Sequence, residues 1–452
     1  MDNVIVKRGY RFNIAGRPST TLKCLPDPEQ LAALPDKIPH IKPRLHVAEG
    51  DPVRIGSVLF EDKREPRFKF LSPAGGTVRR IRFGPRRTIQ AIIIERQSGQ
   101  EPRVGFEALS NDALATIDRK ALVARILDGG LWWVFRELPF RDLPAPENSP
   151  PLILVGLDAK EPFSPAADVY LHGREDLFAF GLKVLSKLCG GKLVVFADAA
   201  DHALIARGRD WLTHTVEGAY PSDDPGAVLY SIKTQASENR AWYVAGQDLM
   251  LLAELLRDGR YPTQRVMTVG GSAAPAPGHF LTRLGTPLSH LADPSQIIQP
   301  ARWIVGGMLR GHTASQEDFM GLYETALNLV PAGGQAEFLA LFTPGFRKPS
   351  YSRIFLSKLN PAPLLYDCNL HGDARACIAC MHCADVCPVD LLPHMVFKAI
   401  AVEEVEEYLQ LGLLDCVDCG LCSYVCPSKI ELSRIFGNAK ASYAREQMKR
   451  SE

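Results

Sequence analysis

Short apolar runs separated by turn residues characterise the first hundred residues of the chain. Between about residues 41 and 97, glycines such as Gly50 and Gly56 punctuate apolar runs that include Val58–Phe60 and Ala91–Ile94. Runs of this length, bounded by glycine and proline, are typical of strands. The pattern therefore predicts a small β domain, to which we assign residues 1–105.

Strand-like and helix-like segments alternate over residues 106–262. Leu152–Gly156 and Leu193–Ala197 are short apolar runs of the kind found in buried strands. Leu177–Leu188 and Trp242–Leu256 instead carry apolar residues at helical spacing. This alternation predicts a layered α/β domain with some parallel strand pairing.

Strand signals return over residues 263–350, where the runs Arg265–Gly271 and Ala301–Gly307 are the clearest. They predict a small mixed β domain. The proline-rich stretch Leu359–Pro363 predicts a linker, because proline restricts both itself and the residue before it. Residues 351–452 form the last predicted domain, and its cysteines set it apart.

The composition excludes several classes of protein. With 46% hydrophobic and 23% charged residues the chain is neither disordered nor fibrous. Its 52 basic and 51 acidic residues give no overall attraction to nucleic acid or to an anionic membrane. We see no run of apolar residues long enough to span a membrane, and no secretory signal. We therefore expect a soluble cytosolic protein in a reducing compartment.

Eight of the eleven cysteines lie between residues 377 and 426. They form the pattern C-x2-C-x2-C-x3-C twice with the same spacing, and a proline, Pro388 or Pro427, follows each copy. This is the pattern of bacterial two-cluster ferredoxins, in which the fourth cysteine of each motif binds the other cluster. The sequence therefore predicts two 4Fe-4S clusters.

The exchange of the fourth cysteine defines two sets of ligands. One cluster is predicted to be held by Cys377, Cys380, Cys383 and Cys426. The other is predicted to be held by Cys416, Cys419, Cys422 and Cys387.

Zinc and disulfides are the alternatives for these cysteines. Zinc sites usually pair two separated C-x2-C halves, and disulfides are rare in the cytosol, so the two-cluster interpretation is the strongest. The remaining Cys24, Cys189 and Cys368 are interpreted as ordinary buried thiols.

An acidic amphipathic segment, His394–Leu411, separates the two motifs. Its apolar residues recur at helical spacing, and glutamates such as Glu403 and Glu407 occupy much of the rest. It predicts one helix with a solvated acidic face, and hence a mostly helical ferredoxin-like domain.

Other features predict no further chemistry. The arginines between Arg79 and Arg87 lack enough aromatic neighbours for nucleic-acid binding and fit a solvated surface or a subunit contact. Trp132 and Trp133 are more typical of a core or an interface than of a ligand pocket. No glycine-rich dinucleotide fingerprint lies between a strand and a helix, and no phosphate-binding loop is present.

Several segments resemble known families. The β region, with His46–Val53 and Leu71–Val78, resembles barrel-sandwich domains of the biotinyl and lipoyl type, without their carrier lysine motif. Lys7–Gly16 and Gly130–Trp132 resemble the A subunit of the sodium-translocating NADH:quinone reductase, and Cys422–Lys429 also resembles the C subunit of the related Rnf complex.

This resemblance implies a cytoplasmic subunit, peripheral to the inner face of the cell membrane, in an ion-pumping oxidoreductase. It implies an α/β domain similar to the flavin-binding subunit of respiratory complex I, followed by a soluble-ligand-binding β-grasp domain. The implied partners are the other subunits of a membrane reductase complex. A quinone contact is also implied, although no motif locates it.

The chain departs from both families. The reductase A subunit usually lacks the ferredoxin cysteines, whereas all eight are present here. The Rnf subunit has a glycine-rich loop for flavin and NADH where this chain has Asp128–Arg136, with Trp132 and Trp133 in place of glycines. We therefore expect neither flavin nor NADH in this domain.

The leading hypothesis is an iron–sulfur electron-transfer subunit of an NADH:quinone or ferredoxin:NAD type of ion-translocating oxidoreductase complex, inactive when isolated. One alternative is a soluble adapter that supplies electrons to a cytosolic reductase or oxygenase. The other is a structural subunit whose clusters brace the fold without conducting.

Overall fold

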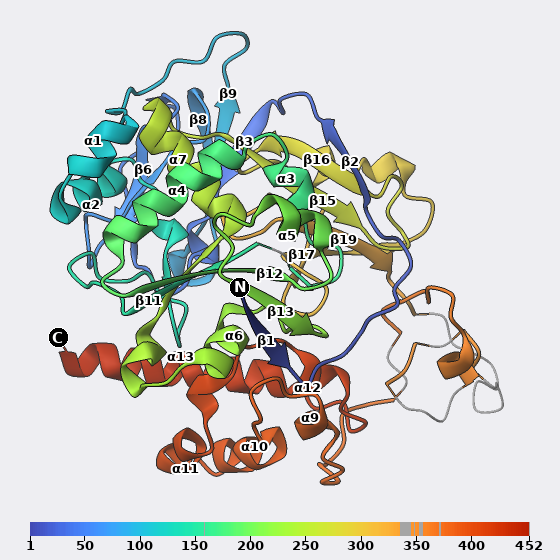
Figure 1. The fold of residues 1–452 in the computed structure, drawn as a ribbon. Helices are drawn as coiled ribbons and strands as arrows, with labels where there is room; N and C mark the ends of the chain where they lie inside the picture. Colours follow the sequence, from blue (N-terminus) through green and yellow to red (C-terminus); the bar gives the residue numbers. More distant parts are fainter. Residues whose placement is uncertain (158, 335–344, 348, 352–355, 370–371, 452) are drawn as a thin grey trace.

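The computed structural model describes residues 1–157, 159–334, 345–347, 349–351, 356–369 and 372–451. Three β-containing parts lie together in Figure 1, and the C-terminal helices lie along one side of them. Within the described residues, no helix is both long enough and apolar enough to cross a membrane.

Two small sheets form the N-terminal β part, as predicted. One sheet has four strands in the order β3-β9-β8-β5 and the other has three in the order β4-β6-β7. The strands are β3 Gln30–Ala33, β4 Pro43–Leu45, β5 Pro52–Val53, β6 Val58–Asp62, β7 Lys69–Leu71, β8 Gly76–Phe83 and β9 Ile89–Arg96. Apolar side chains from both sheets are buried in a shared core, where Phe60 stacks on Phe70 with ring centroids 4.6 Å apart.

A six-stranded sheet with helices on both faces forms the predicted α/β part. Its order is β1-β13-β12-β11-β14-β10; all neighbours from β1 to β14 are parallel, and β10 is antiparallel. The strands are β1 Asp2–Val6, β10 Arg136–Glu137, β11 Leu152–Gly156, β12 Lys192–Asp198, β13 His214–Gly218 and β14 Trp242–Ala245. Because the strands from β1 to β14 run parallel, their carboxyl ends lie at one edge of the sheet.

Helices cover this sheet according to the alternation of side chains along each strand. Ile153 and Val155 of β11 face a core shared with α4 and α7, whereas Leu152 and Leu154 face α6. The helices of this part are α1 Asn111–Thr116, α2 Arg119–Asp128, α3 Ala167–Leu171, α4 Glu175–Leu188, α5 His202–Arg207, α6 Pro225–Ile232 and α7 Gly246–Asp258.

The predicted helix over Trp242–Leu256 begins too early. Trp242–Ala245 is the strand β14, and the helix α7 begins at Gly246. Aromatic and β-branched residues fit a strand between two neighbours, so sheet pairing outweighs the helical spacing of these four residues.

A second six-stranded sheet, mixed in direction, forms the third part. Its order is β18-β17-β19-β15-β16-β2. The elements are β2 Ser19–Cys24, β15 Gln264–Gly270, β16 Gly278–Arg283, α8 Leu288–Leu291, β17 Ala301–Val305, β18 His312–Ala314 and β19 Ala326–Pro331. The two strand runs predicted from the sequence correspond to β15 and β17.

The first 24 residues cross the predicted domain limits. β1 pairs with β13 of the α/β sheet, and β2 pairs with β16 of the third sheet. The N-terminal segment therefore connects the N-terminal β part, the α/β part and the third sheet. The domain limits at 105, 262 and 350 stay predictions.

Short helices and one long helix form the C-terminal part. They are α9 His382–Asp385, α10 Pro393–Ala401, α11 Val405–Gln410, α12 Leu421–Tyr424 and α13 Leu432–Ser451. The single helix predicted over His394–Leu411 is wrong, because Glu403 has a left-handed backbone (φ 60°) and separates α10 from α11. The turn lets both helices pack on one core, and the glutamates stay exposed as predicted.

Candidate iron–sulfur centre

The two cysteine motifs adopt the same backbone conformation at three equivalent positions. The second residue after the first cysteine is left-handed in both, at Ala379 (φ 51°) and Asp418 (φ 51°). The fourth residue after the first cysteine is also left-handed in both motifs, at Met381 (φ 63°) and Gly420 (φ 79°). A four-residue helix follows it in each motif. The third equivalent position lies three residues after the fourth cysteine and is again left-handed, at Asp390 (φ 55°) and Lys429 (φ 56°). Turns of this kind form concave nests of N–H groups that favour anions, and they occur at iron–sulfur sites.

One predicted ligand set lies together in the structure. Cys387, from the first motif, lines the same cavity as Cys416, Cys419 and Cys422 of the second. The cavity that these four cysteines line has a volume of about 20 Å³. These four cysteines are called the inner group, because Cys387 and Cys419 are buried and the group packs against the α/β part.

The other predicted set, called the outer group, consists of Cys377, Cys380, Cys383 and Cys426. Two hydrogen bonds hold the start of the first motif beside the end of the second: the Arg375 N–H donates to the Ser428 carbonyl (2.9 Å), and the Ser428 hydroxyl donates to the Ala376 carbonyl (2.8 Å). Cys383 is buried, whereas Cys380 is exposed. The outer group therefore reaches the surface.

The buried thiols are neutral without iron. Burial raises the pKa of the Cys419 thiol to about 12, and burial also raises the pKa of the Cys416 and Cys422 thiols. A cluster binds thiolates, so its assembly replaces these protons with iron. Among the described residues, no three His, Cys, Asp or Glu side chains lie as the ligands of a single metal ion would.

Side chains from other parts of the chain bond the carbonyls of the inner-group loop. The Tyr220 hydroxyl donates to the Cys419 carbonyl at 2.8 Å, and the Arg141 guanidinium donates to the Val417 carbonyl at 3.1 Å. Lys440 of α13, which is 5% exposed, donates to the Cys416 carbonyl at 2.8 Å and pairs with Asp418 at 2.7 Å. The loop is thus fixed to the α/β part and to α13.

A buried carboxylate joins two of the arginines near this loop. Asp224, fully enclosed at its side chain, lies 2.9 Å from the Arg141 guanidinium and 2.7 Å from that of Arg310. Burial alone would raise its pKa, but the two arginines outweigh burial and lower the pKa of Asp224 to about 2. Next to it, burial raises the pKa of Asp223 to about 6 against the opposing effect of Arg310.

Sequence reasoning missed these residues. Arg141, Tyr220 and Asp224 belong to no motif, and only the fold brings them to the cysteines. The Asp-Pro pair at 224 and 225 signals a helix start, because Asp224 also accepts the Gly226 N–H at 2.7 Å, but it does not signal the arginines.

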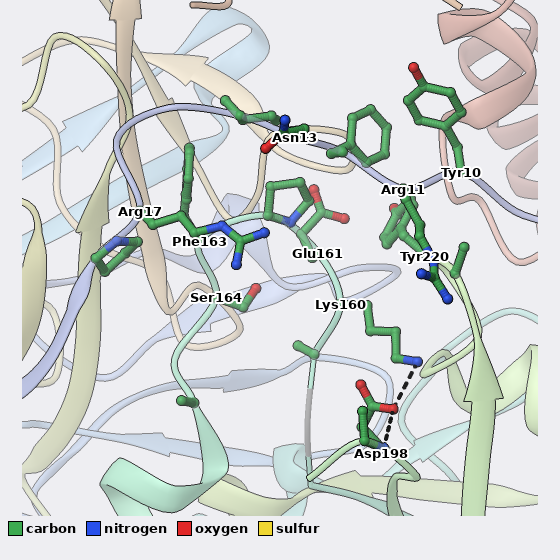
Figure 2. A pocket seen from close by; sticks show the side chains of 18 of the residues that line it. Tyr10, Arg11, Asn13, Arg17, Lys160, Glu161, Phe163, Ser164, Asp198 and Tyr220 are labelled. Carbon is green, nitrogen blue, oxygen red and sulfur yellow. Dashed lines mark hydrogen bonds and ion pairs between the residues drawn. The ribbon is translucent and has the colours of Figure 1, made fainter. Parts of the chain in front are cut away.

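A large cleft lies at the carboxyl ends of the parallel strands, where α/β folds commonly bind ligands. Its volume is about 970 Å³, and the loops after β1, β11, β12 and β13 line it. Figure 2 shows Arg17 and Glu161 in the cleft and the Lys160 side chain paired with Asp198, at 3.1 Å. Tyr220, which donates to the Cys419 carbonyl, also lines the cleft, so the cleft borders the inner group.

The segment Asp128–Arg136 does not line this cleft. Trp132 and Trp133 are 2% and 1% exposed, and the Trp132 indole N–H donates to the Pro144 carbonyl at 2.8 Å. Both tryptophans therefore belong to the core, which was the favoured interpretation. Of the three isolated cysteines, Cys189 and Cys368 are partly buried, but Cys24 is exposed on β2, so its assignment as a buried thiol is wrong.

Comparison with known proteins gives one consistent family. Residues 4–97 match the NqrA N-terminal barrel-sandwich hybrid domain, residues 117–261 the NqrA second alpha/beta domain and residues 376–430 a 4Fe-4S dicluster domain. The A subunit of the Na+-translocating NADH-quinone reductase of Rhodopirellula baltica is 30% identical, with 98% of each chain covered. The same subunit of Vibrio anguillarum is 29% identical, with 96% of this chain and 97% of that one covered.

Likeness to solved structures is weaker. A chain of NAD+-reducing NiFe hydrogenase in its H2-reduced state aligns with a TM-score of 0.38 and 12% identity over 76% of this chain and 68% of that one. Such a score supports no argument about fold. The similarity to the flavin-binding subunit of complex I therefore stays a prediction.

Proposed function

Because the chain belongs to the family of Na+-translocating NADH-quinone reductase A subunits, we propose that its inner and outer groups hold two 4Fe-4S clusters in series. The chain is an iron–sulfur electron-transfer subunit of an ion-translocating NADH:quinone reductase. The inner cluster would use Cys387, Cys416, Cys419 and Cys422, and the outer cluster would use Cys377, Cys380, Cys383 and Cys426. The clusters would supply one-electron transfer, and the protein holds their thiolates and sets their surroundings.

One observation supports a conducting role above others: the inner group packs against the α/β part, while the outer group reaches the surface at Cys380. Two centres arranged in this way give a path between a partner at the surface and the interior. Ile378 and Met381, beside Cys380, are 67% and 47% exposed. We propose that another subunit of the complex docks over them.

The finer expectations from the family are part of this proposal. The subunit would lie at the cytoplasmic face of the membrane, held there by its partner subunits. The parallel sheet with helices on both faces supports a domain similar to the flavin-binding subunit of complex I. The mixed third sheet, with its short helix, is compatible with a β-grasp domain.

Serine substitutions test ligand sets and conduction together. Cys383→Ser should damage the outer cluster, and Cys387→Ser, only four residues away, should damage the inner one. Electron paramagnetic resonance of each reduced variant identifies the cluster lost. Identical spectra from the two variants would rule out the exchange of the fourth cysteine.

Turnover of the assembled complex separates conduction from bracing. If the clusters conduct, both serine variants slow electron transfer even where the subunit still assembles. Wild-type turnover by an assembled variant complex would show that the clusters only brace the fold. A Cys24→Ser variant is the matched control, since Cys24 lies on β2 outside both groups.

A further inference from the structure

A buried carboxyl group lies between the large cleft and the inner group. Glu161, in the loop after β11, is 7% exposed and lines the cleft (Figure 2). Its Oε1 accepts the Leu309 N–H at 2.6 Å. The Leu309 carbonyl in turn lies against Gly420, the neighbour of Cys419, and Leu309 packs on the core that contains Cys419. One residue, Leu309, therefore separates Glu161 from the inner-group loop.

The second carboxyl oxygen of Glu161 has no partner among the described residues. Its Oε2 is enclosed and accepts no hydrogen bond there. The Tyr220 hydroxyl lies beside this carboxyl group, but it donates its single proton to the Cys419 carbonyl at 2.8 Å. A protonated Glu161 has a proton to give to the Tyr220 oxygen. The surroundings thus offer the neutral acid a hydrogen bond that they do not offer the carboxylate.

Carboxyl groups outnumber cations around Glu161. Arg310, from the loop after β17, faces three of them, on Glu161, Asp223 and Asp224. It pairs with Asp224 at 2.7 Å, and Asp224 pairs with Arg141 as well. Two arginines thus meet three acids, and Asp224 takes both arginines. Burial raises the pKa of Glu161 against the opposing effect of Arg310.

Other charged groups on the cleft are paired or exposed. Lys160 pairs with Asp198 at 3.1 Å. His279 of β16 accepts the Ala166 N–H at Nε2 and donates from Nδ1 to the Ser19 carbonyl, so its ring is neutral. The rest of the titratable lining consists of the exposed Arg11, Arg17 and Glu217 and of the hydroxyls of Tyr10 and Tyr220. Glu161 is therefore the enclosed acid that water in the cleft can reach.

We propose that Glu161 takes up one proton when the inner cluster is reduced and releases it when the cluster is reoxidised. This inference rests on the proposed function, because it requires a cluster at the inner group. The electron comes from the outer cluster, which is oxidised in return. The proton comes from water in the cleft and binds Oε2 of Glu161, so the site as a whole gains no charge. When the electron leaves, the proton returns to that water.

The charge that reduction adds raises the proton affinity of Glu161. At a separation of about 10 Å and an effective dielectric constant of about 20, one charge changes that affinity roughly tenfold. By linkage, the inner cluster is about 59 mV easier to reduce with Glu161 neutral than with Glu161 ionised, because a tenfold change corresponds to that value for one electron. The inner potential should therefore be constant where Glu161 is neutral in both redox states. It should fall as the pH rises through the two pKa values and then become constant again.

Redox titrations of the anaerobic holo-protein at a series of pH values, followed by paramagnetic resonance, test this. The series runs from about pH 5 to about pH 9, which covers the pKa values known for buried glutamates. Glu161→Gln cannot ionise, but its amide oxygen can still accept the Leu309 N–H. Its inner potential should equal that of the wild type at the acid end and exceed it by about 59 mV at the alkaline end. The outer potential should be the same in both proteins.

Two further variants and a second measurement locate the proton. Glu161→Asp keeps a carboxyl group and should keep a pH-dependent inner potential. Glu217→Gln removes an exposed carboxyl group on the same cleft and is the matched control, which should behave as the wild type. In infrared difference spectra, the C=O band of a neutral carboxylic acid should appear when the wild type is reduced and be missing from Glu161→Gln. Iron content is measured in every variant, so that loss of a cluster is recognised.

Three outcomes would overturn the inference: a wild-type inner potential that does not change with pH, a pH dependence that persists in Glu161→Gln, or its loss in Asp223→Asn or Glu217→Gln instead. If Glu161→Gln does not fold, Glu161→Asp decides, because it should shift both the infrared band and the midpoint of the pH dependence.

Failure of the proposed function is distinguishable. If iron content and the serine variants show that the inner cluster is missing, the proposed function is wrong. If two clusters are present and conduct but the inner potential ignores pH, only the role of Glu161 is wrong.

Discussion

Neutralising Arg141 should lower the reduction potential of the inner cluster. The Arg141 guanidinium donates to the Val417 carbonyl at 3.1 Å, inside the loop between Cys416 and Cys419. Reduction adds one negative charge to a cluster, and a nearby cation stabilises that charge. Arg141→Met keeps much of the side-chain length and removes the cation, so reduction of the inner cluster becomes less favourable.

The size of the effect follows from the position of the charge. Because Val417 adjoins Cys416, a separation of about 10 Å and an effective dielectric constant of about 20 give an interaction of roughly 1.7 kcal/mol. For one electron this is roughly 70 mV, an upper value because Asp224 partly compensates Arg141. The outer cluster is farther from Arg141, and its exposure to solvent screens the charge further. Its potential should change much less.

Redox titration of the anaerobic holo-protein, followed by paramagnetic resonance, measures both potentials. Arg141→Lys keeps the charge and should retain most of the inner potential. Arg240→Met removes an arginine that is paired with Glu137 and 69% exposed at its side chain, and it is the matched control. Equal shifts of both clusters, or a shift in the Lys variant as large as in the Met variant, would refute the electrostatic reasoning.

Three further predictions concern the metal, the donor and the pH. The anaerobically purified protein should contain about eight irons, in two four-iron clusters; stoichiometric zinc without the broad visible absorbance of iron–sulfur clusters would contradict this. The isolated chain should not oxidise NADH, because it lacks a dinucleotide fingerprint; bound flavin with rapid reduction of the clusters by NADH would contradict that. Burial raises the pKa of the Asp223 carboxyl from 3.8 to about 6, so the folded state holds this proton more tightly than the unfolded state. The stability that the protonated carboxyl contributes is therefore fully present below pH 4 and is lost as the pH rises through 6. Asp223→Asn cannot ionise, so the variant is spared this loss of stability, which is at most about 3 kcal/mol. The difference in melting temperature between the variant and the wild type should therefore grow between pH 5 and pH 7; a constant difference would contradict the assignment.

The sequence predicted well those features that depend on local spacing. The repeated cysteine spacing assigns Cys387 to one set with Cys416, Cys419 and Cys422; these four line one cavity, and their role as ligands stays a prediction. The short apolar runs became β11 and β12 because their residues alternate between two buried faces. Each cysteine motif and each apolar run is recognised within one short segment, so its recognition needs no knowledge of the fold.

Features that depend on distant residues were not predictable. Arg141 is 83 positions from Asp224 and 276 from Val417, and no pattern in the chain connects them. Glu403 has a left-handed backbone, which glutamate does not favour. The turn at Glu403 lets two short helices, α10 and α11, both pack on one core, which one long helix would not do. The pairing of β1 and β2 with different sheets likewise depends on contacts made after more than 200 further residues.

Bracing and conduction are compatible roles for the inner group but not for the outer one. The contacts from Tyr220 and Arg141 that fix the inner loop would hold the C-terminal part to the α/β part whether or not electrons pass. A cluster that only braces gains nothing from the surface, where water and oxygen reach it. Cys380 is nevertheless exposed, and the apolar side chain of Ile378 beside it is 67% exposed. An apolar surface around an accessible cluster ligand is what a redox partner requires, so the position of the outer group argues for conduction.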